Sequence, residues 1–256
     1  MTAPPSSTEP VIIIGSLLSP YVRKVLAVLN LKGLAYRVDP IVPFLGDERF
    51  TAVSPLRRIP VLIDDRVTLA DSSVICQYLE DRYPGPPVYP ADVADRARAR
   101  WLEEFADTRM GDVFIWRIFN QVAIGPHIFG RETDRAALEK TVRDELPPIL
   151  DYLEALAPPD GFAFGPLSIA DIGVAAFFRN LAFSRVQLDE GRWRRTAAWV
   201  ARTLAHPCLA SLAPLEEALL KTPRSQHREA LARMGVSLTA DTWGTETPRP
   251  GIMRID

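Results

Sequence analysis

The chain has 256 residues, of which 47% are hydrophobic and 24% are charged, and its formal net charge is -2. This length and apolar content suffice for one large domain or two small domains with a buried core. The near-neutral balance gives no broad basic field, which argues against nucleic acid as a partner. No stretch approaches a membrane-spanning helix in apolar length, so no membrane association is expected.

Two cysteines, Cys76 and Cys208, lie far apart and form neither a CxxC motif nor a metal-ligand spacing. This usage favours a reducing compartment over a disulfide framework, and we expect both thiols to be buried or inert. Residues 1–10 are rich in Pro, Ser and Thr and lack the basic start and apolar core of a signal peptide. We therefore expect a flexible N-terminal extension and a cytoplasmic location.

Motifs of several other chemistries are absent from the sequence. The patterns GxGxxG, GxxxxGK[ST], GxSxG and HExxH do not occur. The histidines His127, His206 and His227 are dispersed along the chain, so we expect no metal site.

Residues 11–83 have the element order of a thioredoxin-like α/β domain. Val11–Ile14 is a β-branched run and predicts a buried strand. Ser19 suits the N-cap of the helix that follows, and Gly33 suits its end. Residues 35–38 predict a second strand, which completes a βαβ unit.

The second half of this domain predicts two strands and a further long helix. Residues 47–53 are expected to form a short helix or an irregular turn. Apolar runs at 61–63 and 67–69 flank a polar turn and predict a hairpin, and residues 71–82 carry helical periodicity. The order βαβ then ββα predicts a mixed four-stranded sheet.

Beyond a Pro-rich linker at residues 84–91, the pattern becomes almost wholly helical. Residues 92–221 are predicted to form an all-α helical bundle, with helices at about 92–121, 132–156, 168–183, 192–204 and 207–221. Ser168 and Asp171 form a capping box, which predicts a sharply defined helix start. Residues 222–256 form a C-terminal extension, with a short helix at 226–234 and then a segment rich in Gly, Pro and Thr that is expected to cross the surface without regular structure.

Three motifs follow one another along the first domain. They are Ser-Pro-Tyr-Val-Arg-Lys-Val at 19–25, Ser-Pro-Leu-Arg-Arg-Ile-Pro-Val-Leu at 54–62 and the pair Asp71–Ser72. Together with the capping box at 168–171, this series resembles the cytosolic glutathione S-transferase family over about residues 11–221. The resemblance implies a thioredoxin-like domain followed by an all-α domain, with glutathione as a cosubstrate.

The resemblance places Ser19 where serine-type members hold the residue that meets the glutathione sulfur. A hydroxyl there donates a hydrogen bond to a thiolate and, with the positive start of the helix, increases the ionised fraction of a thiol whose free pKa is about 8.5. Ser16 is the alternative donor, because some serine-type members place the hydroxyl earlier in this loop. The alternative to any catalytic role is that Ser19 only caps the helix.

The resemblance also implies the groups that bind the rest of glutathione. Ile59 precedes a cis proline, Pro60, and offers its backbone to the cysteinyl residue, whereas a trans proline at the start of a strand is the alternative. Asp71 and Ser72 match the pair that holds the γ-glutamyl end, with ordinary helix capping as the alternative. Arg58 falls where a polar side chain approaches the glycyl carboxylate, and Arg57 before it departs from the commoner glycine.

A second, hydrophobic substrate is expected between the Ser19 loop and the first long helix of the all-α domain. The apolar candidates on that helix are Phe105, Met110, Phe114 and Trp116, for which packing in the core is the alternative role. Their chemistry indicates only an apolar or aromatic electrophile.

The leading hypothesis is an enzyme that uses the glutathione thiolate to attack such an electrophile, a reaction suited to detoxification. Ether cleavage, dehalogenation, peroxide reduction and isomerisation are enzyme alternatives that use the same half-site. A non-catalytic ligand-binding or protein-interaction module is the alternative from another class. The resemblance further implies a homodimer that uses no metal and no tightly bound cofactor beyond glutathione.

Overall fold

The structure is a computed structural model that describes residues 10–249, so the predicted extension at 1–10 lies outside it except for its last residue. The chain divides into two compact units, one holding residues up to 87 together with those from 207 onward, and the other holding residues 88–206. The helical residues 207–221, which the sequence pattern assigned to the all-α domain, belong to the first unit.

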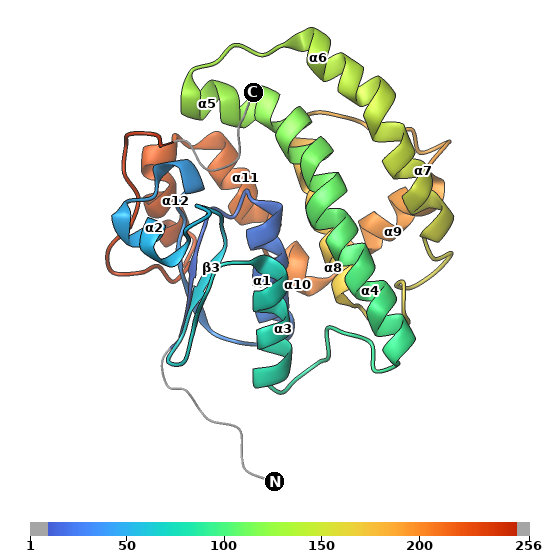
Figure 1. Ribbon diagram of the computed structural model, residues 1–256, viewed down its shortest axis with the longest axis horizontal. Helices are drawn as coiled ribbons and strands as arrows, with labels where there is room; N and C mark the ends of the chain where they lie inside the picture. The colour runs from blue at the N-terminus through green and yellow to red at the C-terminus, as the bar shows by residue number, and fades with distance from the viewer. Residues whose placement is uncertain (1–9, 250–256) are drawn as a thin grey trace. The chain divides into compact units, whose positions relative to one another are not determined.

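The first unit contains the predicted mixed sheet, with strand order β2-β1-β3-β4. Its elements, in chain order, are β1 (Val11–Ile14), α1 (Pro20–Leu31), β2 (Tyr36–Asp39), η1 (Pro43–Leu45), α2 (Glu48–Val53), β3 (Val61–Ile63), β4 (Thr68–Leu69), α3 (Ser72–Arg82), α10 (Pro207–Ala210), α11 (Ala213–Lys221), η4 (Arg224–Gln226) and α12 (His227–Arg233) (Figure 1). The predicted βαβ–ββα order is confirmed.

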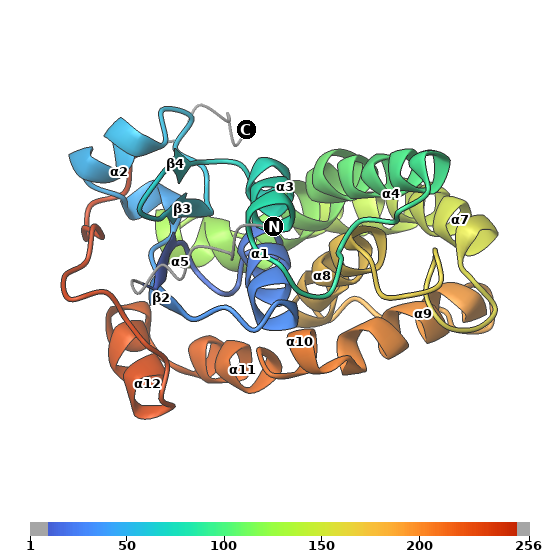
Figure 2. The ribbon, with the colours of Figure 1, turned by 90° about the horizontal axis from the view of Figure 1, so that it is seen from below.

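Strand pairing places one apolar face of the sheet beneath α2. Strand β1 is parallel to β2 and antiparallel to β3, with Ile14 opposite Val61. These two residues form a buried cluster with Ile41 and Phe50. Helices α2 and α3 lie on opposite sides of β3 in both views (Figures 1 and 2).

The turn between β3 and β4 contacts α3 through the buried carboxylate of Asp64. Tyr78 Oη donates to Asp64 Oδ2 at 2.6 Å, and Arg82 Nη1 lies 2.8 Å from the same oxygen. Burial opposes ionisation of Asp64, but the hydrogen bonds from Tyr78 and from the backbone of Arg66 and Val67 outweigh it and lower its pKa. Burial and the Asp64 contact also raise the pKa of Tyr78 to about 12.

We expect Asp64→Asn to lower the free energy of unfolding by about 2 kcal/mol at neutral pH, because charge-assisted hydrogen bonds are lost. A carboxylate whose pKa is lowered in the folded state stabilises the fold at pH values above its unfolded-state pKa of about 3.9. This contribution to stability is lost as the pH falls through the folded-state pKa. Urea denaturation between neutral and acid pH should therefore show a flatter acid limb for this variant. Asp65→Asn, at a half-exposed carboxylate that also contacts Arg82, is the matched control; equal losses from both variants would contradict the assignment to Asp64.

Helices α10 and α11 belong with the sheet because polar groups of α1 bind them. Arg23 and Glu216 form an ion pair whose side chains are both 1% exposed. Asn30 Nδ2 donates to the Cys208 carbonyl at 3.0 Å. The single helix predicted over 207–221 is interrupted before α11, where Pro214 lacks the N–H that a continuous helix would use.

The C-terminal extension has more structure than its composition predicted. The expected helix is present as η4 and α12, but the following segment is not free of regular pairing. Leu238 forms a parallel bridge with Val38 of β2, and Gly244 forms an antiparallel bridge with Gly46. The physical reason is that β2 is an edge strand of the four, and its outward backbone groups need partners.

The second unit is helical, as predicted for most of its length. Its elements are α4 (Val93–Phe105), η2 (Ala106–Ile124), α5 (Gly125–Phe129), α6 (Arg135–Lys140), η3 (Thr141–Glu145), α7 (Leu146–Leu156), α8 (Ile169–Phe183) and α9 (Arg194–Ala205). The helix predicted at 92–121 continues to Ile124, but the segment from Ala106 to Ile124 is π-type, and at its end the Gly125 N–H donates to the fifth preceding carbonyl, that of Asn120. The helix predicted at 132–156 likewise contains a π-type turn, directly before two prolines open α7.

The centre of this unit is built around Asp171, which is fully buried near the start of α8. Asp171 and Ser168 form the predicted capping box. The carboxylate also accepts hydrogen bonds from the Ala163 N–H at 2.8 Å and from Trp199 Nε1 at 2.7 Å. One side chain therefore joins the start of α8 to α9 and to the loop before α8.

Both cysteines are buried, as expected, and burial raises the pKa of Cys208 to about 11. Within residues 10–249, no helix combines the length and apolar content needed to cross a membrane. Over the same described part of the chain, no group of three or more His, Cys, Asp or Glu side chains is arranged to hold a metal ion.

Candidate functional site

Ser19 lies at the N-cap of α1, directly after the loop that leaves β1. Its backbone is extended, and its side-chain oxygen accepts a hydrogen bond from the Val22 N–H at 3.5 Å. This cap bond is long, and it uses the hydroxyl as an acceptor, which leaves the hydroxyl proton available to a ligand. The side chain is partly exposed. Capping and donation to a thiolate are therefore compatible at this residue.

Ser16, the alternative donor, is 3% exposed and lies one turn of the loop earlier. Its oxygen accepts from the Leu18 N–H at 3.4 Å, and its carbonyl accepts from the Ser19 N–H at 3.0 Å. Ser16 thus supports the loop from inside, whereas Ser19 stands at its more accessible end. This geometry favours Ser19 over Ser16 as the donor to the glutathione sulfur, and both assignments stay predictions.

Gly15 brings this loop against the second motif. It has φ +150°, and a Cβ at this position would lie 2.6 Å from Val22 Cγ2 and 3.0 Å from Ile59 Cβ. The absence of a side chain is what allows the start of α1 and the Ile59 loop to approach each other. We expect Gly15→Ala to displace both the start of α1 and the loop that holds Ile59. The position of Gly15 at the end of a strand did not indicate this close contact.

The second motif has the cis peptide bond that the resemblance implied, between Ile59 and Pro60. The buried Ser54 side chain holds the preceding backbone, because its Oγ accepts from the Arg58 N–H at 3.0 Å and donates to the Arg58 carbonyl at 2.9 Å. The Arg58 side chain is exposed. Arg57 adopts a left-handed conformation with φ 49°, which explains why glycine is common at this position.

The third motif opens α3. Asp71 is its N-cap, and Oδ1 accepts from the N–H groups of Ser73 and Val74 at 3.0 and 3.1 Å. The capping role predicted as the alternative is therefore present, and it leaves Oδ2 of this exposed carboxylate to accept from a ligand. Ser72, at 5% exposed, is the first residue of the helix.

Lys24 joins the first and third motifs, a role that the sequence analysis missed. Its fully buried ammonium donates to Ser73 Oγ at 3.0 Å, so the second turn of α1 meets the first turn of α3. A lysine within the apolar face of a helix was the available signal, because buried lysines are rare unless paired. The three motifs are thus linked within one unit through Gly15 and Lys24.

The residues proposed for a hydrophobic pocket all lie in the second unit. Met110 and Phe114 are fully buried, and Phe114 packs edge-on against Phe178 with ring centroids 5.5 Å apart. Phe105 and Trp116 are partly exposed, and Phe105 packs against Tyr152. The complete burial of Met110 and Phe114 favours a packing role for these two residues. A second-substrate pocket stays a prediction.

Comparison with known proteins agrees with this arrangement in the first unit. A family model described as "Glutathione S-transferase, N-terminal domain" matches residues 13–87. Glutathione S-transferase Z2 of Arabidopsis thaliana is 38% identical over 78 residues, which are 29% of this chain and 35% of that protein. The chain spans about a third of the length of the plant relatives it matches in this way.

Longer similarity comes at lower identity. The Escherichia coli (strain K12) protein named "Uncharacterized GST-like protein YibF" is 26% identical over 175 residues, covering 68% of this chain and 83% of that protein. A glutathione S-transferase from Methylobacterium radiotolerans, solved in complex with glutathione sulfonate, has a TM-score of 0.66 and 25% identity. That similarity covers 79% of this chain and 94% of the solved chain. The fold of both units is thus that of known proteins.

Proposed function

We propose that the chain, whose residues 13–87 match the N-terminal domain model of the glutathione S-transferase family, is a serine-type enzyme of that family that binds glutathione and activates its thiol. The thiolate would attack an apolar or aromatic electrophile and release a thioether or a displaced leaving group. The candidate side chains for the second substrate, Phe105, Met110, Phe114 and Trp116, are apolar or aromatic, which matches an apolar or aromatic electrophile.

The observation that carries the proposal is the state of the Ser19 hydroxyl. It lies partly exposed at the positive start of α1, and its cap bond leaves the proton free to be donated. A donor and a helix dipole at one point both stabilise a thiolate over a thiol. Ser19 would thereby lower the thiol pKa of bound glutathione without forming a covalent bond to it.

The remaining groups suit the other parts of the tripeptide. Asp71 Oδ2 accepts from the γ-glutamyl ammonium, while Ser72 donates to the adjoining carboxylate. The Ser73 and Val74 N–H groups already bind Asp71, so Ser72 is the donor that remains at this helix start. The Ile59 backbone pairs with the cysteinyl residue, and exposed Arg58 approaches the glycyl carboxylate.

We expect Asp71→Asn to weaken glutathione binding by about tenfold, because a charge-assisted contact to the ammonium becomes a neutral one. Thermal stability should change little, since asparagine is also a good N-cap. Calorimetric titration and thermal unfolding on the same samples separate the two effects. Asp92→Asn, which alters a similar N-cap at the start of α4, is the control; unchanged glutathione affinity in the Asp71 variant would remove this residue from the site.

The proposal is tested first by titrating the protein with glutathione in a calorimeter and by following thiolate absorbance of the bound ligand across pH. Binding with a thiol pKa below about 8.5 is the expected result. Binding with an unshifted thiol pKa would instead favour a non-catalytic ligand-binding module on this fold. Absence of binding would contradict the proposal and favour a protein-interaction role.

Ether cleavage, dehalogenation, peroxide reduction and isomerisation stay as enzyme alternatives, because each begins with the same bound thiolate. A detoxification role, a homodimer and a cytoplasmic location are likewise proposals that follow from family membership. A screen of electrophiles with purified protein, run alongside measurement of its mass in solution, addresses the reaction subtype and the dimer separately.

A further inference from the structure

The C-terminal extension contributes a segment, residues 236–249, that we name the strap. Its first part pairs with β2, since the Val38 N–H donates to the Ser237 carbonyl at 2.9 Å and the Thr239 N–H donates to the Val38 carbonyl at 3.2 Å. The strap therefore extends the sheet beyond β2 and covers backbone groups that would otherwise form an open edge.

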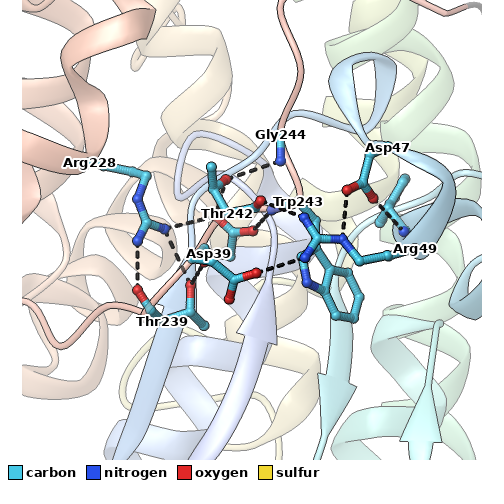
Figure 3. A network of polar contacts seen from close by, with 10 residues as sticks. Asp39, Asp47, Arg49, Arg228, Thr239, Thr242, Trp243 and Gly244 are labelled. Carbon is cyan, nitrogen blue, oxygen red and sulfur yellow. Dashed lines mark hydrogen bonds and ion pairs between the residues drawn. The ribbon is translucent and has the colours of Figure 1, made fainter.

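Asp39, the last residue of β2, connects the strap to the candidate site. Its side chain is 1% exposed. The carboxylate accepts from three groups of the C-terminal extension, namely Arg228 Nη1 at 3.0 Å, Thr242 Oγ1 at 2.7 Å and the Trp243 N–H at 2.7 Å (Figure 3). The carbonyl of the same residue accepts from the Gly15 N–H at 2.8 Å. Asp39 thus binds the strap on one side and, on the other, the glycine that lies against Ile59.

The second half of the strap holds the segment that leads into α2. Three backbone hydrogen bonds join them: Asp47 N–H to Trp243 carbonyl at 2.8 Å, Thr245 N–H to Leu45 carbonyl at 2.6 Å, and Arg249 N–H to Phe44 carbonyl at 2.7 Å. Arg49 adds a donor to the Thr242 carbonyl at 2.8 Å (Figure 3). The Trp243 side chain packs against the buried cluster that includes Phe50 and Val61. Helix α2 has only six residues, so these contacts supply much of its support.

Arg57 carries this support to the second motif. Its Nη2 donates to the Pro43 carbonyl at 3.1 Å and to the Gly46 carbonyl at 2.9 Å, and its guanidinium lies 5.6 Å from the centre of the Phe50 ring. The strap holds the segment from Phe44 to Arg49, and Arg57 binds that segment two residues before Ile59. The path from strap to motif therefore consists of direct contacts.

We propose that the strap is a positioning element for the glycyl half of the glutathione site, and that Trp243 of the strap and Asp39 of β2 are positioning residues. This inference rests on the proposed function. The γ-glutamyl end is assigned to Asp71 at the start of α3, and the cysteinyl residue to Ile59. Because α2 and α3 lie on opposite sides of β3, a tripeptide that runs from Asp71 past Ile59 continues toward the α2 side, which the strap supports (Figures 1 and 2).

The experiment compares two ligands, glutathione and γ-glutamylcysteine, which lacks the glycine. We expect Trp243→Ala to weaken glutathione binding by about tenfold and γ-glutamylcysteine binding by less than about twofold. Trp243→Phe should restore most of the glutathione affinity, because a smaller ring still fills part of the same site. Thr242→Val, which removes the hydrogen bond that Thr242 Oγ1 donates to Asp39 and the one that it accepts from the Gly244 N–H with little change in shape, should give a weaker loss in the same direction.

Hydrogen exchange of residues 43–58 supplies a readout independent of any ligand. It should become faster in Trp243→Ala while exchange of α1 stays unchanged. Arg233→Ala, which removes an exposed ion pair with Glu229 in α12, is the control and should leave affinities and exchange unaltered.

Equal losses for both ligands, or no loss for either, would overturn the positioning role while leaving the proposed function intact. If the parent protein binds neither ligand, the proposed function fails and the inference fails with it. If Trp243→Ala does not fold, Thr242→Val alone decides, and equal affinities for that variant and the parent would overturn the inference.

Discussion

Replacing Ser19 by glycine is expected to lower kcat/KM for glutathione conjugation by on the order of 100-fold. The hydroxyl that donates to the thiolate is removed, so the thiol pKa of bound glutathione should return toward about 8.5. Glycine is itself an acceptable N-cap, and the hydrogen bond lost from the Val22 N–H to Ser19 Oγ is long. The free energy of unfolding should therefore change by only a few tenths of a kcal/mol. Steady-state kinetics, thiolate absorbance and urea denaturation on one preparation measure the three quantities.

Two further variants decide which serine faces the sulfur. Ser16→Ala should leave the thiol pKa of bound glutathione unchanged, because Ser16 is buried within the loop. Ser19→Asn keeps a cap and a repositioned donor, and should retain more activity than Ser19→Gly. If Ser19→Gly turns over like the parent and Ser16→Ala does not, the donor is Ser16 and Ser19 is only a cap.

Replacing Asp171 by alanine is expected to destabilise the second unit by about 4 kcal/mol. The carboxylate is fully buried and accepts hydrogen bonds from two backbone N–H groups, a hydroxyl and an indole N–H. Alanine at this position would leave these four donors without their acceptor. Asp171→Asn keeps one acceptor oxygen and should lose less. Urea denaturation, fitted for the transition of this unit, measures the difference.

Asp189→Ala provides a matched comparison for this effect. Asp189 also accepts from two backbone N–H groups, those of Gly191 and Arg192, but it does so at the surface, where water replaces it. We expect a loss below about 1 kcal/mol there. A similarly small loss for Asp171→Ala would mean that the buried donors find other partners, and would contradict the central role assigned to this carboxylate.

Local signals predicted the helix caps and the strand end within the three motifs, because these features are set by short-range chemistry. Ser19 and Asp71 cap the helices that follow them, and the strand from Val11 to Ile14 ends at a glycine, as the pattern indicated. The cis bond before Pro60 came from the family resemblance rather than from the residues alone. The roles of these residues toward glutathione remain predictions.

Long-range contacts could not be predicted in the same way. Asp39 and Arg228 are 189 positions apart, and nothing in the composition of the extension indicates that it pairs with β2. The π-type helix from Ala106 to Ile124 was also missed, because the sequence pattern was compared only with α-helical spacing. Residues 207–221 group with the sheet through a contact of the same kind, since Glu216 pairs with Arg23 near the other end of the chain.

The first unit is assembled from two stretches of polypeptide separated by the whole of residues 88–206. During synthesis, the sheet leaves the ribosome first, and the segment that pairs with β2 follows only after that entire unit, a delay on the order of ten seconds. Throughout this interval the outer side of β2 is bare and open to pairing with other chains. A product whose translation stops before Ser237 would keep that bare strand edge permanently, and it would stay open to edge-to-edge pairing with other chains.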